Sequence, residues 1–267
     1  MRKFFRRLIQ GLLVVVIFYC LWQIGSYIWE RKQSDDSFAS VQEKVTRYES
    51  PQKMGSGHKG PFPDLSEQVN YQGLMQELQR LNNDIVAYLE VSGTQIQYPV
   101  VQAGNNDYYL RRGINKKYSL PGIPFMDYRN AKDLSDQNTV IYGHMMNYVK
   151  TSMFGEFEHF LDQAYVDQSP KLFRLIHPTG VYYYRLIAVV RIHEEEDYRE
   201  PNKEAQAFLA DIEKLRKESV VQLGYDGPLS PNSRVVTLST CTPDHDRTYR
   251  IALVGLLEKY EIGRAHV

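Results

Sequence analysis

A run of uncharged, mostly apolar residues near the N-terminus limits what the first part of this chain can become. Residues 8–29 carry no formally charged side chain. A helix of roughly 20 apolar residues is long enough to cross the hydrocarbon core of a bilayer. The run therefore predicts a transmembrane helix, and any water-soluble domain has to form from the residues that follow it.

Basic residues at the start of the chain predict the orientation of this helix. Four of the first seven residues are Arg or Lys, and the positive bias after residue 29 is weaker. Because positive residues stay preferentially on the cytoplasmic side, the N-terminus is expected in the cytoplasm and the remaining chain outside the cell membrane. A cleaved signal peptide is the alternative, disfavoured because the run is long and no small-x-small cleavage site follows closely. We expect an uncleaved signal anchor.

Composition after the anchor separates a stalk from a compact domain. Residues 37–48 place apolar side chains at helical spacing, which predicts a short amphipathic helix or a stalk. Residues 50–63 contain three Pro, three Gly and few large apolar side chains, a composition typical of a linker. The predicted parts are a cytoplasmic N-terminus with the anchor over 1–29, a stalk and linker over 30–63, a compact domain over 64–262 and a tail of unassigned role over 263–267.

Short apolar segments separated by turn residues predict a domain rich in β-structure. One helix is expected near 68–81, and another at 204–217 with Asn202 as its N-cap and an apolar face that packs on the core. Many short strands with few helices favour an antiparallel β-barrel or sandwich with helices on the outside. The expected strands cover 95–102, 139–142, 173–176, 181–192, 235–238 and 251–257.

The balance of charge bears on the kind of partner. The chain has 32 basic and 32 acidic residues and a formal net charge of zero. No global field attracts nucleic acid or draws the domain to an anionic bilayer. Nucleic acid is therefore not an expected partner, and the protein has to recognise its partners through a local site.

Cys241 is the leading candidate for chemistry. It is the only cysteine outside the apolar run, and it ends the strand-like segment 235–241. Oxidising compartments favour paired cysteines, so a lone thiol on an exported domain suggests a nucleophile. A buried cysteine acting as a small hydrophobic residue is the alternative. That alternative is weaker because a polar turn, rather than more core, follows Cys241.

The connection after Cys241 predicts which residue lies beside it. Residues 242–249 are too few for the crossover between parallel strands, so the strands on either side are expected to be antiparallel. Cys241 and Arg250 then lie at the same edge of the sheet, where a guanidinium could stabilise a thiolate or an oxyanion. An ordinary exposed charge at Arg250 is equally compatible with the spacing. Arg247, within the turn, is the competing arginine.

A cysteine nucleophile usually acts with a histidine. His144 follows the apolar strand 139–142 and Gly143, a position from which a side chain is presented at the mouth of a sheet. His245, four residues after Cys241, is the main rival, and with its flanking aspartates it could suggest a metal site. The spacing of these ligand types matches no established zinc pattern. His159 is expected to pack or to face solvent.

Four short segments form a recognisable set when they occur together in this order. They are Pro124–Asn130 (PFMDYRN), Asn138–Met146 (NTVIYGHMM), Thr237–Thr242 (TLSTCT) and Arg250–Gly255 (RIALVG). Together they resemble the class B sortases, cysteine transpeptidases of the Gram-positive cell surface. The resemblance covers about residues 64–260, and it assigns the family's catalytic histidine, cysteine and arginine to His144, Cys241 and Arg250. Ser239 matches a serine of class B sites, and Thr240 belongs to the threonine–cysteine end of the same strand.

The resemblance implies a fold and a reaction. The expected fold is a closed eight-stranded β-barrel with N-terminal helices and one extra helix before the penultimate strand. The expected reaction cleaves a C-terminal sorting signal after its threonine, forms a thioester with Cys241 and transfers the protein to an amine. His144 would act as general acid and base, and Arg250 would hold the substrate carbonyl.

The implied partners are surface or pilin proteins that carry a sorting signal. The acceptor is either the cross-bridge amine of a lipid-linked peptidoglycan precursor or a pilin lysine, and no cofactor or metal ion is expected. A secreted cysteine peptidase that only hydrolyses and an inactive surface-binding module are the alternatives. Papain-like peptidases are disfavoured because their cysteine usually precedes their histidine in the chain.

Overall fold

The computed structural model describes residues 2–49, 70–145, 152–241 and 248–262. Contacts divide the chain into two units, Met1–Ser40 and Val41–Val267. The helices are α1 (Arg2–Glu49), α2 (Tyr71–Leu81), α3 (Gln163–Gln168) and α4 (Ala205–Lys217), with 3-10 helices η1 (Tyr108–Arg111) and η2 (Gly155–Leu161). The strands are β1 (Ile85–Val91), β2 (Gln97–Val101), β3 (Phe125–Met126), β4 (Asn138–Tyr142), β5 (Leu172–His177), β6 (Gly180–His193), β7 (Val235–Cys241) and β8 (Tyr249–Ile262).

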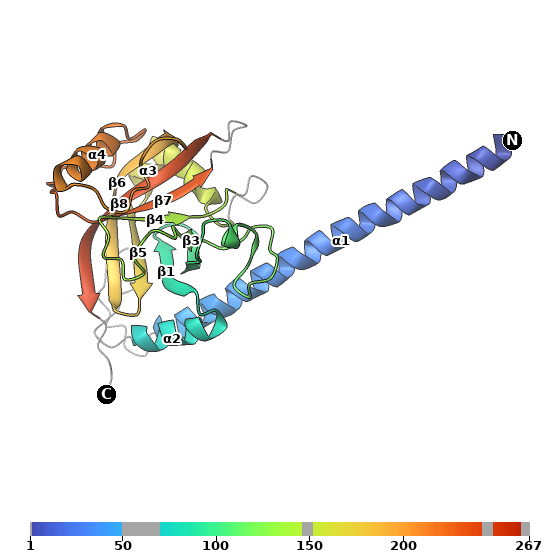
Figure 1. The fold of residues 1–267 in the computed structure, drawn as a ribbon, viewed down its shortest axis with the longest axis horizontal. Coiled ribbons are helices and arrows are strands. Elements are labelled where there is room, and N and C mark those ends of the chain that lie inside the picture. The colour runs from blue at the N-terminus through green and yellow to red at the C-terminus, as the bar shows by residue number, and fades with distance from the viewer. Residues whose placement is uncertain (1, 50–69, 146–151, 242–247, 263–267) are drawn as a thin grey trace. The chain divides into compact units, whose positions relative to one another are not determined.

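The eight strands of the second unit form a closed barrel in the order β1-β2-β3-β4-β7-β8-β6-β5, shown in Figure 1. The predicted closed barrel with added helices is confirmed. The residue pattern also predicted antiparallel pairing throughout, which is wrong for β2–β3 and β4–β7, because both pairs are parallel. Parallel neighbours need a connection of a dozen or more residues, and the segments between these strands are longer than that.

Alternation along the strands sorts side chains between the barrel interior and an outer layer. On β7, Val236 and Leu238 point into the interior cluster, where they meet Ile141 and Leu253 from neighbouring strands. Val235, one residue out of phase, belongs instead to a second cluster on the outside of the barrel. A strand exposes successive residues to opposite faces, so β7 is buried on both. The end of β7 is therefore held rigidly, which matters for the residue that terminates it.

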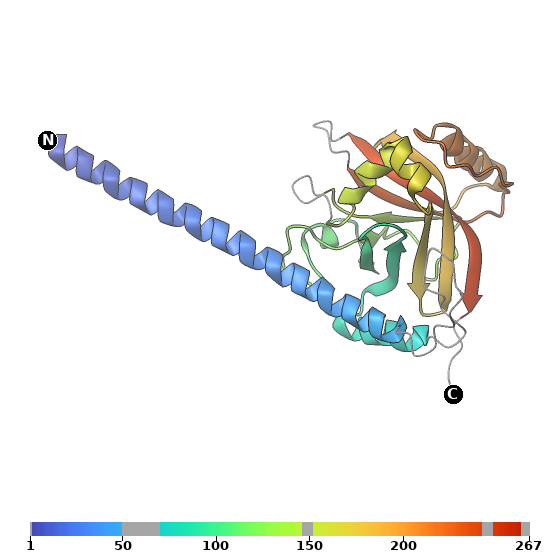
Figure 2. The same cartoon turned by 180° about the vertical axis from the view of Figure 1, so that it is seen from behind.

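Helix α4 lies on the outside of the barrel in both views (Figures 1 and 2), and its apolar side chains belong to the outer cluster. The predicted helix and its core-facing stripe are confirmed, since Phe208 and Ile212 are buried against β6, β7 and β8. Its predicted cap is wrong. The Glu204 carboxylate accepts the hydrogen bonds at the first turn. The Asn202 side-chain oxygen, the atom that a cap would use, instead accepts from the Gln137 N–H at 3.1 Å, and its amide nitrogen donates to Asp136 Oδ1 at 2.6 Å.

Helix α1 contains the predicted apolar run. Its segment Phe4–Trp29 is long and apolar enough to cross a membrane, by length and composition. Its last turns belong to the second unit, where Val41 and Val45 are buried and Lys44 Nζ lies 2.6 Å from Glu77 Oε1. The predicted linker, the predicted domain start at residue 64 and the tail at 263–267 lie outside the described residues.

Candidate active site

Three neighbouring strands bring the candidate residues to one end of the barrel. In the parallel pair β4–β7, Tyr142 lies opposite Ser239, and the Gly143 N–H then donates to the Ser239 carbonyl at 3.1 Å. His144 and Cys241 are each two residues beyond that matched pair. Parallel strands in register carry residues of equal offset side by side on the same face. The register therefore brings His144, just past the end of β4, and Cys241, the last residue of β7, to the same end of two neighbouring strands.

The antiparallel pairing of β7 with β8 brings in the arginine. Cys241 lies directly opposite Arg250, the predicted geometry for this short connection, which is thereby confirmed. Directly opposed residues of two strands project from the same face of the sheet. Cys241 and Arg250 are thus paired across β7 and β8, and His144 follows the end of the neighbouring strand β4 by two residues. The competing residues His245 and Arg247, with the rest of 242–247, lie outside the described residues.

The position of His144 is set by close packing at the preceding Gly143 and by a hydrogen bond to its ring. A Cβ at Gly143 would lie 2.6 Å from the nearest Phe154 ring atom, so a larger residue here would force the ring or the backbone to shift. The His144 Nε2 atom lies 2.7 Å from the Leu110 carbonyl oxygen. Because a carbonyl only accepts, Nε2 carries the proton of the neutral ring. Nδ1 is then the nitrogen left to exchange a proton with a substrate.

The environment of His144 favours the neutral imidazole. Burial of the ring lowers its pKa below the ordinary value, and the positive charge of Arg111 lowers it further. The hydrogen bond to the Leu110 carbonyl acts in the opposite direction and raises the pKa. The ring is therefore predominantly a base near neutral pH, as a group that accepts a proton during a reaction has to be.

The Arg250 guanidinium is fixed at the strand end. Its Nη2 lies 2.5 Å from Glu194 Oε2, and its Nη1 donates to the Tyr249 carbonyl at 3.0 Å. Glu194 itself is tied down, since its N–H donates to the Thr248 carbonyl just past the β6–β8 ladder. The guanidinium is about a quarter exposed, with a side-chain accessibility of 23%. A fixed positive charge therefore lies one strand from Cys241.

The residues before Cys241 are buried polar groups. Ser239 Oγ lies 3.0 Å from the Tyr198 hydroxyl, and both side chains are buried. The Thr240 hydroxyl is buried and has no hydrogen-bond partner among the described residues. Sequence reasoning identified Ser239 and Thr240 but missed Tyr198, which lies in the segment between β6 and α4. No local signal marks Tyr198, because only the tertiary fold brings it to Ser239.

Comparison with known proteins agrees with this geometry. No protein-family model matches the chain. Sortase B of Listeria monocytogenes is 25% identical over 244 residues, covering 86% of this chain and 87% of that protein. Sortase B of Staphylococcus aureus is 27% identical over 259 residues, covering 96% and 98%. A solved Staphylococcus aureus sortase B–substrate complex superposes with a TM-score of 0.72 at 25% identity, covering 85% of this chain and 97% of that one.

The chain is a class B sortase. Its sequence relatives and its barrel agree on a cysteine transpeptidase of the sortase type. The resemblance deduced from four short segments is therefore confirmed over most of the chain.

The other histidines within the described part of this sortase, His159, His177 and His193, are held elsewhere or face away. His193 lies near the same barrel end but pairs with Tyr249, one residue out of phase with Arg250, so its side chain points to the opposite face of the sheet. His177 is bonded to Thr179 and to the Lys132 carbonyl. His159 stacks at a tilt on Tyr165, in line with the expected packing role. Within the described ranges no group of three or more His, Cys, Asp or Glu could hold a metal ion.

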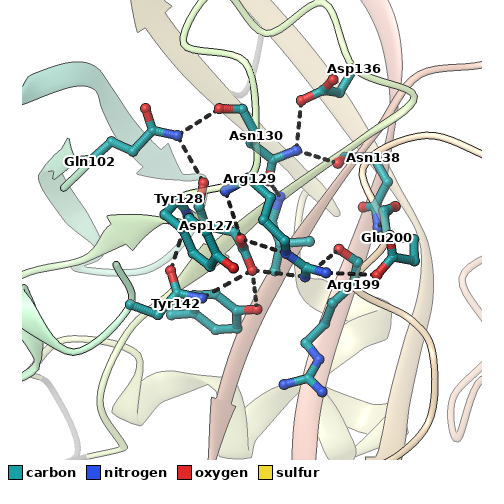
Figure 3. Close-up of polar contacts among 12 residues, drawn as sticks. Gln102, Asp127, Tyr128, Arg129, Asn130, Asp136, Asn138, Tyr142, Arg199 and Glu200 are labelled. Carbon is teal, nitrogen blue, oxygen red and sulfur yellow. Dashed lines mark hydrogen bonds and ion pairs between the residues drawn. The ribbon is translucent and has the colours of Figure 1, made fainter. Parts of the chain in front are cut away.

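A buried polar network lies behind β4 in this sortase (Figure 3). The Tyr142 hydroxyl at the end of β4 donates to Asp127 Oδ2 at 2.9 Å, and the Arg129 guanidinium pairs with the same carboxylate. The segment PFMDYRN was noted as part of the family resemblance, but its carboxylate had no predicted role. Its burial is visible only in the fold.

Proposed function

We propose that this sortase is a membrane-anchored transpeptidase that cleaves a C-terminal sorting signal after its threonine and transfers the protein to an amine. The observation that carries the proposal is the pairing of Cys241 with Arg250 at the end of β7 and β8, beside strand β4, which leads into His144. A base, a thiol and a fixed positive charge are the groups that acyl transfer through a thioester requires. A solved relative is described as a sortase B–substrate complex, which supports a peptide substrate.

The first half-reaction forms the acyl-enzyme. Neutral His144 first accepts the proton of the Cys241 thiol, and the resulting thiolate attacks the threonine carbonyl carbon. The Arg250 guanidinium stabilises the negative charge that develops on the carbonyl oxygen. As the carbon–nitrogen bond breaks, protonated His144 gives its proton to the leaving amine. The products are a thioester on Cys241 and a released C-terminal peptide with a new amino terminus.

The second half-reaction reverses these roles. An incoming amine attacks the thioester carbonyl, neutral His144 accepts the amine's proton, and the Cys241 thiolate leaves. The acceptor is the amine of a peptidoglycan cross-bridge or a pilin lysine. In the first case the product is a wall-anchored protein, and in the second it is a polymer.

The apolar segment of α1 would hold the enzyme at the outer face of the cell membrane, with its N-terminus in the cytoplasm. Segment Phe4–Trp29 meets the length and composition of a span. Exported proteins with sorting signals and lipid-linked precursors meet at that face, so an anchored enzyme would encounter both substrates in one plane.

The proposal is tested with the full-length chain in detergent and a panel of quenched fluorescent sorting-signal peptides. Each peptide is incubated with and without triglycine or an Nα-acetyl-lysine amide. We expect turnover that rises with amine, an amine-capped product, and loss of both in Cys241→Ala and His144→Ala. His159→Ala, which alters a ring outside the site, is the matched control and should retain activity.

Two results would favour the alternatives instead. Cleavage that depends on Cys241 but gives only the hydrolysed product at every amine concentration would indicate a cysteine peptidase. The absence of Cys241-dependent cleavage of every peptide, together with a cellular role that survives Cys241→Ala, would indicate a surface-binding module.

A further inference from the structure

A single buried carboxylate connects the strand that leads into His144 with the segment whose carbonyl binds the His144 ring. Asp127 directly follows β3, and its side chain is fully buried at 0% exposure. Its two oxygens accept hydrogen bonds from three residues that are separated in the chain, and Figure 3 shows two of them, Arg129 and Tyr142. The donors are Arg129 Nε at 3.0 Å, Arg129 Nη2 at 3.1 Å, the Arg129 N–H at 3.0 Å, the Tyr142 hydroxyl at 2.9 Å and Asn106 Nδ2 at 3.2 Å.

The carboxylate is charged under ordinary conditions. Burial would raise the pKa of Asp127, but the hydrogen bonds from Arg129 and Tyr142 outweigh it and leave the pKa below its usual value. Burial and the neighbouring Asp127 charge also raise the pKa of Tyr142, so its hydroxyl keeps its proton and remains a donor. A buried anion with several donors holds each of them strongly, because no water replaces a lost bond.

Two of the three donors lead directly to His144. Tyr142 is the last residue of β4 and lies two residues before it. Asn106 lies just before η1, the turn whose Leu110 carbonyl binds the His144 ring. Asn106 is fixed at both ends, since its Oδ1 also accepts from the Tyr128 N–H at 3.0 Å. The backbone that carries the imidazole and the carbonyl that orients it are thus fixed to one anion.

The third donor extends the network to the segment that follows β6. Arg129 Nη1 pairs with Glu200 at 2.7 Å, and its Nη2 donates to the Arg199 carbonyl at 2.9 Å (Figure 3). Next to them, the Asn138 side-chain amide donates to the Tyr198 carbonyl at 2.9 Å. Loss of the carboxylate would therefore loosen one wall of the site as well as the histidine.

We propose that Asp127 is a positioning residue that sets the orientation and burial of the His144 imidazole. Asp127 itself is too deeply buried to touch a substrate, so it acts only through Tyr142, Asn106 and Arg129. The importance of this for turnover rests on the proposed role of His144 in acyl transfer. The effect of Asp127 on the imidazole is independent of that role and can be measured without any substrate.

The test uses Asp127→Asn in the full-length chain. The amide keeps the shape of the side chain but removes the charge and replaces one acceptor oxygen with a donor, so it cannot satisfy Arg129 and Tyr142 together. Asp136→Asn is the matched control. Asp136 is also a buried carboxylate of this network, but its bonds go to Asn130, Ala131 and Asn202.

The first measurement is a histidine titration by NMR in a Cys241→Ala background, which removes the neighbouring thiol. Among the described residues, Arg111 on η1 is the charged group that acts on the ring. We expect Asp127→Asn to raise the His144 titration midpoint towards its ordinary value, because a loosened ring regains water. Asp136→Asn should leave the midpoint unchanged.

The second measurement is steady-state turnover of a cleaved sorting peptide at natural Cys241. Displacement of a reacting group by about 1 Å can cost on the order of 100-fold in rate. We expect kcat of Asp127→Asn to fall about 10- to 100-fold with a smaller change in KM, and Asp136→Asn to stay within about 3-fold of the parent. A shifted midpoint without peptide turnover in the parent enzyme would uphold the positioning role while the proposed function fails.

Tyr142→Phe keeps the test decisive should Asp127→Asn fail to fold. It removes one hydroxyl that bonds to Asp127 and should raise the His144 midpoint in the same direction. The proposal is overturned if the His144 midpoint stays at its parent value in Tyr142→Phe and in any folded Asp127→Asn. It is also overturned if Asp136→Asn matches Asp127→Asn in both measurements.

Discussion

At the scale of single residues, the His144 ring is subject to opposing influences. Burial and the Arg111 charge lower its pKa, while the Leu110 carbonyl raises it. The Arg111 charge comes from a side chain separate from the ring, so it can be removed without altering the imidazole. This makes the electrostatic contribution of Arg111 measurable by itself.

We predict that Arg111→Ala raises the His144 pKa, because removing a nearby positive charge makes protonation of the imidazole easier. The midpoint should remain below the ordinary value, since burial is the larger effect and persists. An NMR titration measures it. Arg112→Ala is the control, because it removes the same charge from the adjacent residue, whose guanidinium stacks over the Tyr108 ring. Equal shifts in both variants would contradict this assignment.

The choice between the two candidate arginines is also a residue-scale question. Arg250→Ala should lower kcat/KM by roughly 100- to 1000-fold, the usual loss when an oxyanion donor is removed. Arg250→Lys should recover only part of it, because an ammonium lacks the planar fork of donors. Arg247→Ala should retain activity. Peptide-cleavage kinetics of the variants measure these effects. A large loss of kcat/KM in Arg247→Ala with little loss in Arg250→Ala would assign the role to Arg247 instead.

Residue types alone predicted part of the site. The short connection after Cys241 was enough to pair it with Arg250, and the strand before Gly143 was enough to single out His144. Asp127 and Tyr198 could not be found in this way. An aspartate followed by Tyr and Arg is typical of an exposed turn, and its burial depends on β4 and on the segment after β6.

At the scale of elements, periodicity predicted the strands with clear turn signals and missed two others. Strand β1 is buried along its whole length, so it has no polar alternation to recognise. Its Glu90 is polar yet buried, where it pairs with Arg174 of β5. Strand β3 has only two residues and exists because its neighbours complete the ladder. Neither parallel pair could be predicted, because pairing across long connections is decided by the closed barrel.

Helix α4 offers a test of the outer core. Phe208 is 4% exposed and packs on β6, β7 and β8. Phe208→Ala should lower the free energy of unfolding by about 3 kcal/mol or more, from lost burial and the cavity left behind. Denaturant unfolding measures this change. The exposed Gln206→Ala should change stability by less than about 0.5 kcal/mol. Similar values for both would show that α4 does not pack as described.

At the scale of the whole molecule, the chain combines a candidate membrane segment with an enzymatic barrel. The apolar run was evident from composition, and the structure extends it into one helix up to Glu49. Val41 and Val45 at the end of that helix are buried within the second unit. Their spacing predicted an amphipathic helix, but which surface it covers could not be deduced without the fold.

We predict that removal of residues 1–29 converts the protein from membrane-bound to water-soluble, because this segment supplies the apolar span. Alkaline extraction of cell membranes, followed by fractionation, measures how the protein distributes between the membrane and soluble fractions. A variant with Val14, Val15 and Val16 changed to Leu keeps the segment apolar and should remain in the membrane. A full-length chain found in the soluble fraction, or a membrane fraction lacking the first residues by mass, would contradict an uncleaved anchor.

The most direct test of the account is the intact mass of the full-length enzyme after brief mixing with a cleavable sorting peptide, without amine. We predict an adduct equal to the peptide up to its threonine, located on Cys241 and discharged to an amide when triglycine is added. Cleavage without any such adduct, or an adduct that persists in Cys241→Ala, would contradict thioester transfer at this barrel end.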